Sequence, residues 1–229
     1  MKKSDIKNKR IKKEKIKLAM NKRVYFTLTG CHKKLHGLSN RYCYKSNMHK
    51  LIFKDGKFEN VRYRSSIITN CNFNKTLLLG VDFCNCNLRK SRFKNAVLNN
   101  VCFINCNLEG VDFTNSIFQN VVFICTNIDQ TNNFPTKGSF RMYNSYPKIT
   151  IHSQTQEELL ALSLHKELYE PHVLHVSQNK LNYWTLKVLI DVYGEDIFRA
   201  LSAVKNRNNK KCFYTVFSYM KHVEKYLKI

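Results

Sequence analysis

The chain has 229 residues, of which 43% are hydrophobic, and its 39 Lys+Arg against 16 Asp+Glu give a formal net charge of +23. That apolar fraction excludes wholesale disorder, and the sequence has no run of 18 apolar residues that would span a membrane. The nine cysteines include no C-x-x-C pair, which favours reduced thiols in a cytosol over a disulfide framework, and the seven glycines form neither a dinucleotide nor a P-loop motif.

The first 23 residues hold 11 basic and 2 acidic residues, and no apolar stretch follows that would make them a secretory signal. Their few apolar residues form no helical stripe, so we expect a frayed helix or a disordered arm. Such a segment is suited to neutralising phosphates, and we predict that it binds nucleic acid or another polyanion with little sequence preference; a solubility tail is the alternative. The candidate contacts are the eleven basic residues of this segment and three from the C-terminal part of the chain. They are Lys2, Lys3, Lys7, Lys9, Arg10, Lys12, Lys13, Lys15, Lys17, Lys22, Arg23, Arg207, Lys210 and Lys211.

Residues 24–50 are predicted to form an N-terminal cap, with a strand near residues 24–28. Residues 51–130 then divide into sixteen blocks of five without an insertion, such as VDFCN, CNLRK, VCFIN and CNLEG. The third position of every block is a large apolar residue. From Val61 onward the first position is small or β-branched, and the fifth is rich in asparagine. A period of five fits neither a helix nor a strand, and it indicates a coil with four sides that turns a corner at each fifth residue.

Residues 20 apart should therefore stack, about 4.8 Å from one another. One such column contains Tyr63, Phe83, Phe103 and Phe123. A column of small residues flanks a second column of large apolar residues, and it consists of Ser66, Cys86, Cys106 and Thr126. The blocks resemble the pentapeptide-repeat family, whose members form a right-handed quadrilateral β-helix. The resemblance implies a mainly β fold of about four coils over residues 51–130, with open ends that need capping.

Residues 131–154, with two prolines and a glycine, are predicted to be a linker with one strand near residues 149–151. Residues 155–229 are predicted to be a helical domain. Its first helix would start at a capping box, Thr155 to Glu158. Further helices are expected at about residues 182–193, 195–205 and 212–227. The segment from residue 188 to residue 221 is faintly similar to the C-terminal helices of DnaD-like replication proteins.

No catalytic motif appears in the sequence, and the acidic residues form no evident pair at an active-site spacing, so we predict a non-enzymatic protein without catalytic residues, metal ligands or a cofactor. Cys71, Cys86 and Cys106 occupy the small inward position, where a buried thiol acts as a small hydrophobe. Asp82 and Asp112 lie at the polar second position, where we expect them to help the corner turns.

These observations predict a cytoplasmic bacterial binding or scaffold protein, with a protein partner on the β-helix faces, nucleic acid on the basic flanks and no membrane contact. The DnaD-like similarity implies an alternative, a replication or mobile-element accessory protein. Some pentapeptide-repeat proteins modulate topoisomerases by imitating the negative charge of DNA. Residues 51–130 hold 9 basic and 6 acidic residues, a charge that argues against such imitation.

Overall fold

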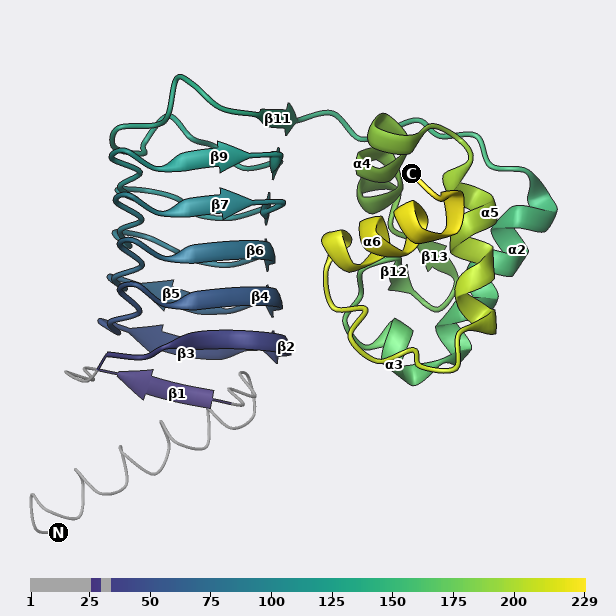
Figure 1. The fold of residues 1–229 in the computed structure, drawn as a ribbon, viewed down its shortest axis with the longest axis horizontal. Coiled ribbons are helices and arrows are strands. Elements are labelled where there is room, and N and C mark those ends of the chain that lie inside the picture. The colour runs from purple at the N-terminus through teal and green to yellow at the C-terminus, as the bar shows by residue number, and fades with distance from the viewer. Residues whose placement is uncertain (1–25, 30–33) are drawn as a thin grey trace, which may run out of the picture.

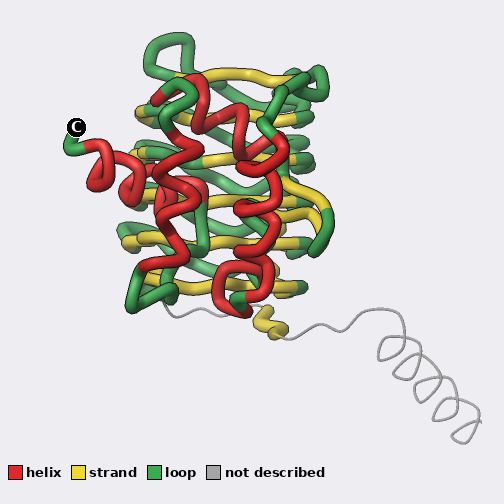
Figure 2. Tube along the Cα trace, turned by 90° about the vertical axis from the view of Figure 1, so that its right-hand side faces the viewer, coloured by secondary structure: helices red, strands yellow, loops and turns green. Residues whose placement is uncertain are grey.

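The computed structural model describes residues 26–29 and 34–229. Parallel strands stack into a solenoid, and a helical domain lies against one face of it (Figure 1). The view turned by 90° shows the helices in front of the stacked strands (Figure 2). No helix in the described ranges has the length and apolar character needed to cross a bilayer.

The solenoid consists of short strands joined by tight corners. They are β1 (Phe26–Thr29), β2 (Gly37–Tyr44), β3 (Ser46–His49), β4 (Lys57–Arg64), β5 (Ile67–Thr69), β6 (Leu77–Cys84), β7 (Val97–Asn99), β8 (Cys102–Ile104), β9 (Ile117–Gln119), β10 (Val121–Ile124) and β11 (Phe140–Tyr143). Parallel pairing in the order β11-β10-β8-β6-β4-β2 builds one continuous face. Its register advances by 20 residues per coil from β2 to β10, as in Cys43↔Tyr63↔Phe83↔Phe103↔Phe123.

The corners follow the five-residue period of the sequence. Every fifth residue from Asn40 to Cys125 has a positive φ, including Gly80 and Gly110. Asparagine, which tolerates the left-handed region better than most residues, holds half of these positions. The prediction of left-handed corners at the fifth position is therefore confirmed.

Stacked side chains fill the interior of the solenoid. The rings of Tyr63, Phe83, Phe103 and Phe123 form one column, with centroids 5.4, 5.2 and 5.2 Å apart and planes within 9° of parallel. Each of these residues is at most 1% exposed. The inward cysteines are buried as expected, and the thiol of Cys106 donates a hydrogen bond to the carbonyl of Phe83 at 3.2 Å.

The solenoid begins earlier than predicted and has about five turns instead of four. β2 and β3 lie in the region expected to form a cap, yet they pair in register with β4 and β5. The apolar pattern before residue 51 is weaker, but its corners at Asn40 and Lys45 already have positive φ. Strand pairing and corner geometry therefore continue the repeat into residues whose side-chain pattern does not indicate it.

The helical domain contains more elements than predicted. They are α2 (Ser153–Ala161), η1 (Leu162–Leu164), α3 (Lys166–Tyr169), β12 (His175–Ser177), β13 (Lys180–Leu181), α4 (Tyr183–Tyr193), α5 (Ile197–Ser202), η2 (Ala203–Asn206) and α6 (Val216–Leu227). The hairpin of β12 and β13 was not predicted, and the expected strand at residues 149–151 is replaced by β11, which adds to the solenoid face.

Two helix starts also differ from the prediction. Helix α2 begins at Ser153 with His152 before it, so Thr155 is not its cap. Helix α6 begins at Val216, four residues later than expected, and its capping box is formed by Thr215 and Ser218. A serine in place of the usual glutamate or glutamine hid this second box from a search for the common S/T-x-x-E/Q form.

Candidate anion-binding cleft

A buried ion pair joins the helical domain to the solenoid. Arg62 on β4 and Asp82 on β6 are 1% and 0% exposed, and the Arg62 guanidinium lies 2.6 Å from an Asp82 carboxylate oxygen. The same oxygen accepts a 3.0 Å hydrogen bond from the backbone N–H of Val216, the first residue of α6. Asp82 was expected to support a corner; instead it holds a helix N-terminus, where a negative charge is favourable. Asp112 does support a corner, because it accepts a hydrogen bond from the backbone N–H of Thr114.

A second polar group fixes the segment that precedes α6. The side-chain amide of Asn60 donates to the carbonyl of Cys212 at 2.7 Å, and its oxygen accepts from the Thr215 hydroxyl at 2.9 Å. Asn60 thus joins a corner of the solenoid to the cap of α6. Its amide also donates to Asn40, one coil below. These contacts place the start of α6 directly above the corner residues of β2 and β4.

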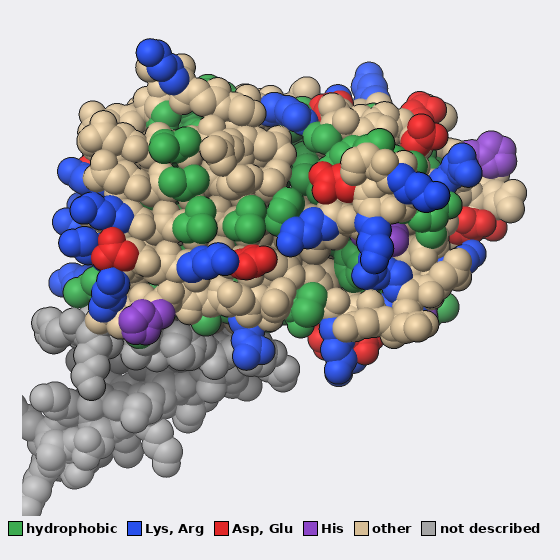
Figure 3. Space-filling view, viewed as in Figure 1, with side chains coloured by type: hydrophobic (Ala, Val, Ile, Leu, Met, Phe, Trp, Pro, Cys, Tyr) green, Lys and Arg blue, Asp and Glu red, His purple; other side chains and the backbone are tan. Residues whose placement is uncertain are grey.

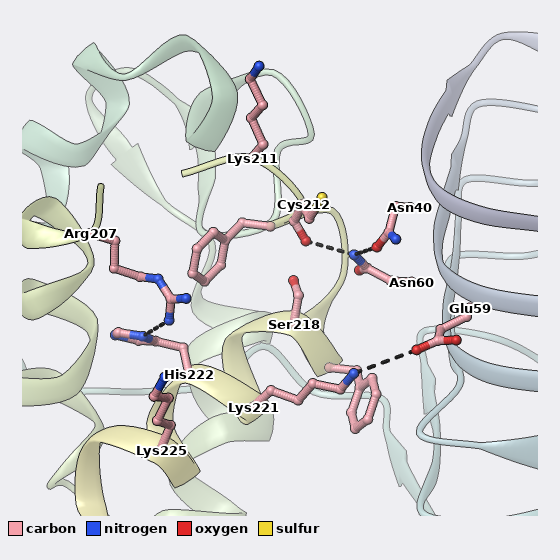
Figure 4. Close-up of a pocket in the computed structure, with 12 residues that line it drawn as sticks. Asn40, Glu59, Asn60, Arg207, Lys211, Cys212, Ser218, Lys221, His222 and Lys225 are labelled. Carbon is pink, nitrogen blue, oxygen red and sulfur yellow. Dashed lines mark hydrogen bonds and ion pairs between the residues drawn. The ribbon is translucent and has the colours of Figure 1, made fainter. Parts of the chain in front are cut away.

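A cavity of about 290 Å³ opens beside these contacts (Figure 4). Four cationic side chains line it, and Glu59 is the one carboxylate among the described lining residues. The lining consists of Asn40, Glu59, Asn60, Arg207, Lys211, Cys212, Phe213, Phe217, Ser218, Lys221, His222 and Lys225. Lysine and arginine side chains gather on the helical part close to the junction (Figure 3). We call this cavity the basic cleft.

Arg207 is held in position by His222. The His222 Nε2 lies 2.7 Å from the carbonyl of Ala200, which can only accept, so this nitrogen carries the proton. Its Nδ1 then accepts a 3.0 Å hydrogen bond from Arg207. Burial lowers the pKa of His222, and the imidazole is therefore neutral at pH 7. Arg207 has no carboxylate partner in the described part of the chain.

The three lysines of the basic cleft have weak partners or none. Lys221 lies 3.8 Å from a Glu59 oxygen, a long ion pair, and 4.7 Å from the centre of the Phe217 ring. Within the described ranges, the ammonium groups of Lys211 and Lys225 have no hydrogen-bonding or ion-pair partner. Four cationic side chains around a single carboxylate leave a net positive charge, and the resulting local positive potential attracts anions.

Some of the predicted site residues line the basic cleft, and others do not. Arg207 and Lys211 line the basic cleft, whereas Lys210 donates to the backbone carbonyl of Arg207 and supports that loop. The eleven candidates from Lys2 to Arg23 lie outside the described residues. Lys221 and Lys225 were missed, although their spacing of four residues on a predicted helix put them on one face. No group of three or more metal-binding side chains occurs among the described residues.

The repeats match a family model. Residues 66–103 and 98–132 match the pentapeptide-repeat model, with eight copies. No curated protein sequence matches the chain.

Solved structures with similar folds include trypsin-treated QnrB1, a plasmid-mediated fluoroquinolone resistance protein, at 17% identity and a TM-score of 0.43 over 46% of this chain. The chain spans 56% of the length of that protein. A pentapeptide-repeat protein from the Arabidopsis thaliana thylakoid lumen aligns at 16% identity and a TM-score of 0.32, over 44% of this chain and 71% of its own. The register of the strands and the positive-φ corners agree with this match, which identifies residues 66–132 as pentapeptide repeats.

Proposed function

We propose that this chain is a non-catalytic binding protein whose basic cleft and N-terminal basic segment contact the phosphates of nucleic acid. The observation that carries the proposal is the set of four cations in one cavity with Glu59 as the carboxylate among the described lining residues. The flexible lysine stems and the oriented guanidinium of Arg207 suit phosphate oxygens. Contacts to phosphates carry no sequence information, so binding would depend little on sequence.

The arrangement of the cleft supports a fixed rather than a diffuse contact. Arg207 directly follows η2, Lys221 and Lys225 lie on α6, and the solenoid fixes α6 through Asp82 and Asn60. Positively charged groups on a rigid support lose less conformational entropy on binding than the same groups on a free tail. The accessory role in replication that the C-terminal resemblance implies stays a prediction.

A salt series tests the cleft. We expect the double variant Lys211→Gln/Lys225→Gln to bind labelled single-stranded and duplex DNA more weakly, and the slope of log K against log salt to fall by up to about 2. The matched control is Lys148→Gln/Lys180→Gln, which removes the same charge at two exposed positions away from the described cavities. Equal loss in the two variants would show a general charge effect and contradict the assignment to the cleft.

The N-terminal segment is tested in the full chain. Replacement of Lys12, Lys13, Lys15 and Lys17 by glutamine should lower the salt slope further, by up to about 4 if each lysine neutralises one phosphate. The measurement is the same titration, with the unchanged thermal transition as a check on folding. An unchanged slope would assign the affinity to the cleft alone and would leave the segment as a solubility tail.

A further inference from the structure

A second cavity lies at the opposite edge of the solenoid face that carries the helical domain. The basic cleft involves the corner residues Asn40 and Asn60, whereas this cavity involves the ends of β4, β6, β8 and β10. Its volume is about 430 Å³, within the range of small-molecule sites. The lining consists of Arg62, Arg64, Cys84, Asn85, Ile104, Asn105, Ile124, Cys125, His172, His175, Val176, Asn182 and Trp184. We call it the tryptophan cavity; no aspartate or glutamate of the described chain lines it.

A pair of stacked amides stands in its wall. The amide of Asn105 donates to the side-chain oxygen of Asn85 on the neighbouring coil, at 2.8 Å. This leaves the Asn85 amino group and a lone pair on the Asn105 oxygen without another partner among the described residues. Neighbouring coils are about 4.8 Å apart. The pair thus presents a free donor and a free acceptor at its two ends, and either can hydrogen-bond to the edge of a nucleobase.

Apolar side chains complete the wall. Ile104 and Ile124 come from the solenoid, while Val176 and Trp184 come from β12 and α4 of the helical domain. Val176 is 51% exposed, so its apolar side chain is accessible to a ligand. Planar heterocycles stack on aromatic rings and pack against aliphatic side chains, and each such contact tolerates any base.

Arg64 lies between this cavity and an adjoining one. It lines both, and the second, of about 540 Å³, is formed with Tyr42, Tyr44, Tyr169, Glu170 and His172. The Arg64 guanidinium lies 5.3 Å from the Tyr44 ring centre and 3.5 Å from the Tyr42 hydroxyl. No carboxylate of the described residues forms an ion pair with it; Glu170 pairs with Lys166 instead. Its charge is available to an anion.

Several buried nitrogens in the same wall have no hydrogen-bonding partner. Arg62 and His175 are 1% and 0% exposed, and the Arg62 Nε and the His175 Nδ1 are unpaired, as is the His172 Nδ1. The His175 Nε2 lies 2.9 Å from the Leu159 carbonyl, so its Nδ1 is a free acceptor. Burial and the nearby Arg64 lower the pKa of His172, which is neutral at pH 7. Unpaired polar atoms are rare in buried walls and concentrate at functional sites.

We propose that the tryptophan cavity binds a nucleotide, with the base between Trp184 and the Asn85–Asn105 pair and the phosphate at Arg64. The ligand is either a free mononucleotide or an unpaired nucleotide of a single strand, since both offer the same base edge and phosphate. The proposal does not depend on the basic cleft, which shares no lining residue with the tryptophan cavity.

Trp184 is the single tryptophan of the sequence, so its fluorescence reports on this cavity. We would titrate the full chain with AMP, CMP, GMP and UMP, and with short single-stranded oligonucleotides, at about 0.15 M salt. We expect a saturable change in Trp184 emission. A response to mononucleotides identifies a free nucleotide as the ligand, and a response to oligonucleotides alone identifies a strand. No response to any of them at millimolar concentration would overturn the proposal.

Two variants locate the site. Arg64→Gln should weaken binding about tenfold, or about 1.4 kcal/mol. Asn105→Gly should weaken it severalfold, while Asn95→Gly should have no effect. Asn95 is the matched control, because both asparagines occupy corners with positive φ that glycine also adopts. Far-UV circular dichroism checks the fold of each.

The nucleotide titration tests the tryptophan cavity separately from the basic cleft. Lys211→Gln/Lys225→Gln should leave the mononucleotide titration unchanged. Oligonucleotide binding in the salt series, with no Trp184 response to any mononucleotide or oligonucleotide, would support the cleft and end the present proposal. Equal affinities of the wild type, Arg64→Gln and Asn105→Gly for the same nucleotide would place the ligand elsewhere and also overturn it.

Discussion

Gly80 lies at a corner of the solenoid that is in close contact with Phe217 of the helical domain. Its φ is +60°, and a Cβ built on it would lie 2.2 Å from Cδ1 of Phe217 on α6. An L-residue in the left-handed region costs about 1–2 kcal/mol, and overpacking adds about 1–3 kcal/mol. Gly80→Ala should therefore lower the free energy of unfolding by roughly 2–5 kcal/mol, measured by urea denaturation.

Gly110 provides the comparison for this prediction. Its φ is +66°, but a Cβ there would lie 3.3 Å from the side-chain Cγ of Lys90, a much longer approach than at Gly80. Gly110→Ala should show the backbone cost of about 1–2 kcal/mol without the clash. Combining Gly80→Ala with Phe217→Ala should recover part of the loss, because the smaller side chain makes room. Similar losses for the two glycine variants would contradict a close contact between Gly80 and α6.

At the scale of the element, the stacked aromatic column carries the solenoid core. Phe103 lies between Phe83 and Phe123, with both ring centroids 5.2 Å away. Phe103→Leu keeps an apolar side chain of similar volume and loses the ring contacts, so we expect a cost of about 1–2 kcal/mol. Phe103→Asp would bury a charge without a partner, and the solenoid should not fold. The thermal transition measures both, and an unchanged transition in Phe103→Asp would contradict the register.

The same columns show how far the sequence determines the fold. The repeat of Phe83, Phe103 and Phe123 at intervals of 20 was sufficient to predict the coil, its corners and its core, because each coil contacts its neighbours alone. The basic cleft was predictable in part, since Arg207 and Lys211 form a short basic run, while Lys221 looks like an ordinary exposed helix residue. The role of Asp82 was not predictable. Its partner Val216 is 134 residues away, and the second position of a repeat gives no sign of which residues a separate domain will cover.

At the scale of the whole molecule, the solenoid and the helical domain share a core. Cys102, Val122 and Ile124 of the solenoid face belong to the same buried cluster as Leu186 and Val216 of the helical domain. The two proposed sites lie at opposite edges of this contact, and each takes residues from both parts. Their geometry therefore depends on the docking of the helices, and a change that loosens the contact should weaken both sites together.

The Arg62–Asp82 pair tests this dependence. Removing one partner of a buried ion pair leaves the other charge without compensation and costs about 3–5 kcal/mol. Asp82→Ala also removes the acceptor of the Val216 N–H at the start of α6. We expect the helical domain, followed by Trp184 fluorescence, to unfold at a lower urea concentration than the solenoid, followed by amide hydrogen exchange in β6 and β8. In the wild type the two transitions should coincide, because the parts share a core.

The double variant Arg62→Met/Asp82→Leu separates the lost charge from the lost contact. Well-packed apolar residues can replace a buried ion pair at little cost, so we expect this variant to recover most of the stability that Asp82→Ala loses. The N–H of Val216 stays without its acceptor in both variants, and the remaining deficit should be about 1–3 kcal/mol, the cost of an unpaired buried donor. If Asp82→Ala left both probes coincident at an unchanged midpoint, the ion pair would not hold the two parts together. The two sites would then depend on apolar packing alone.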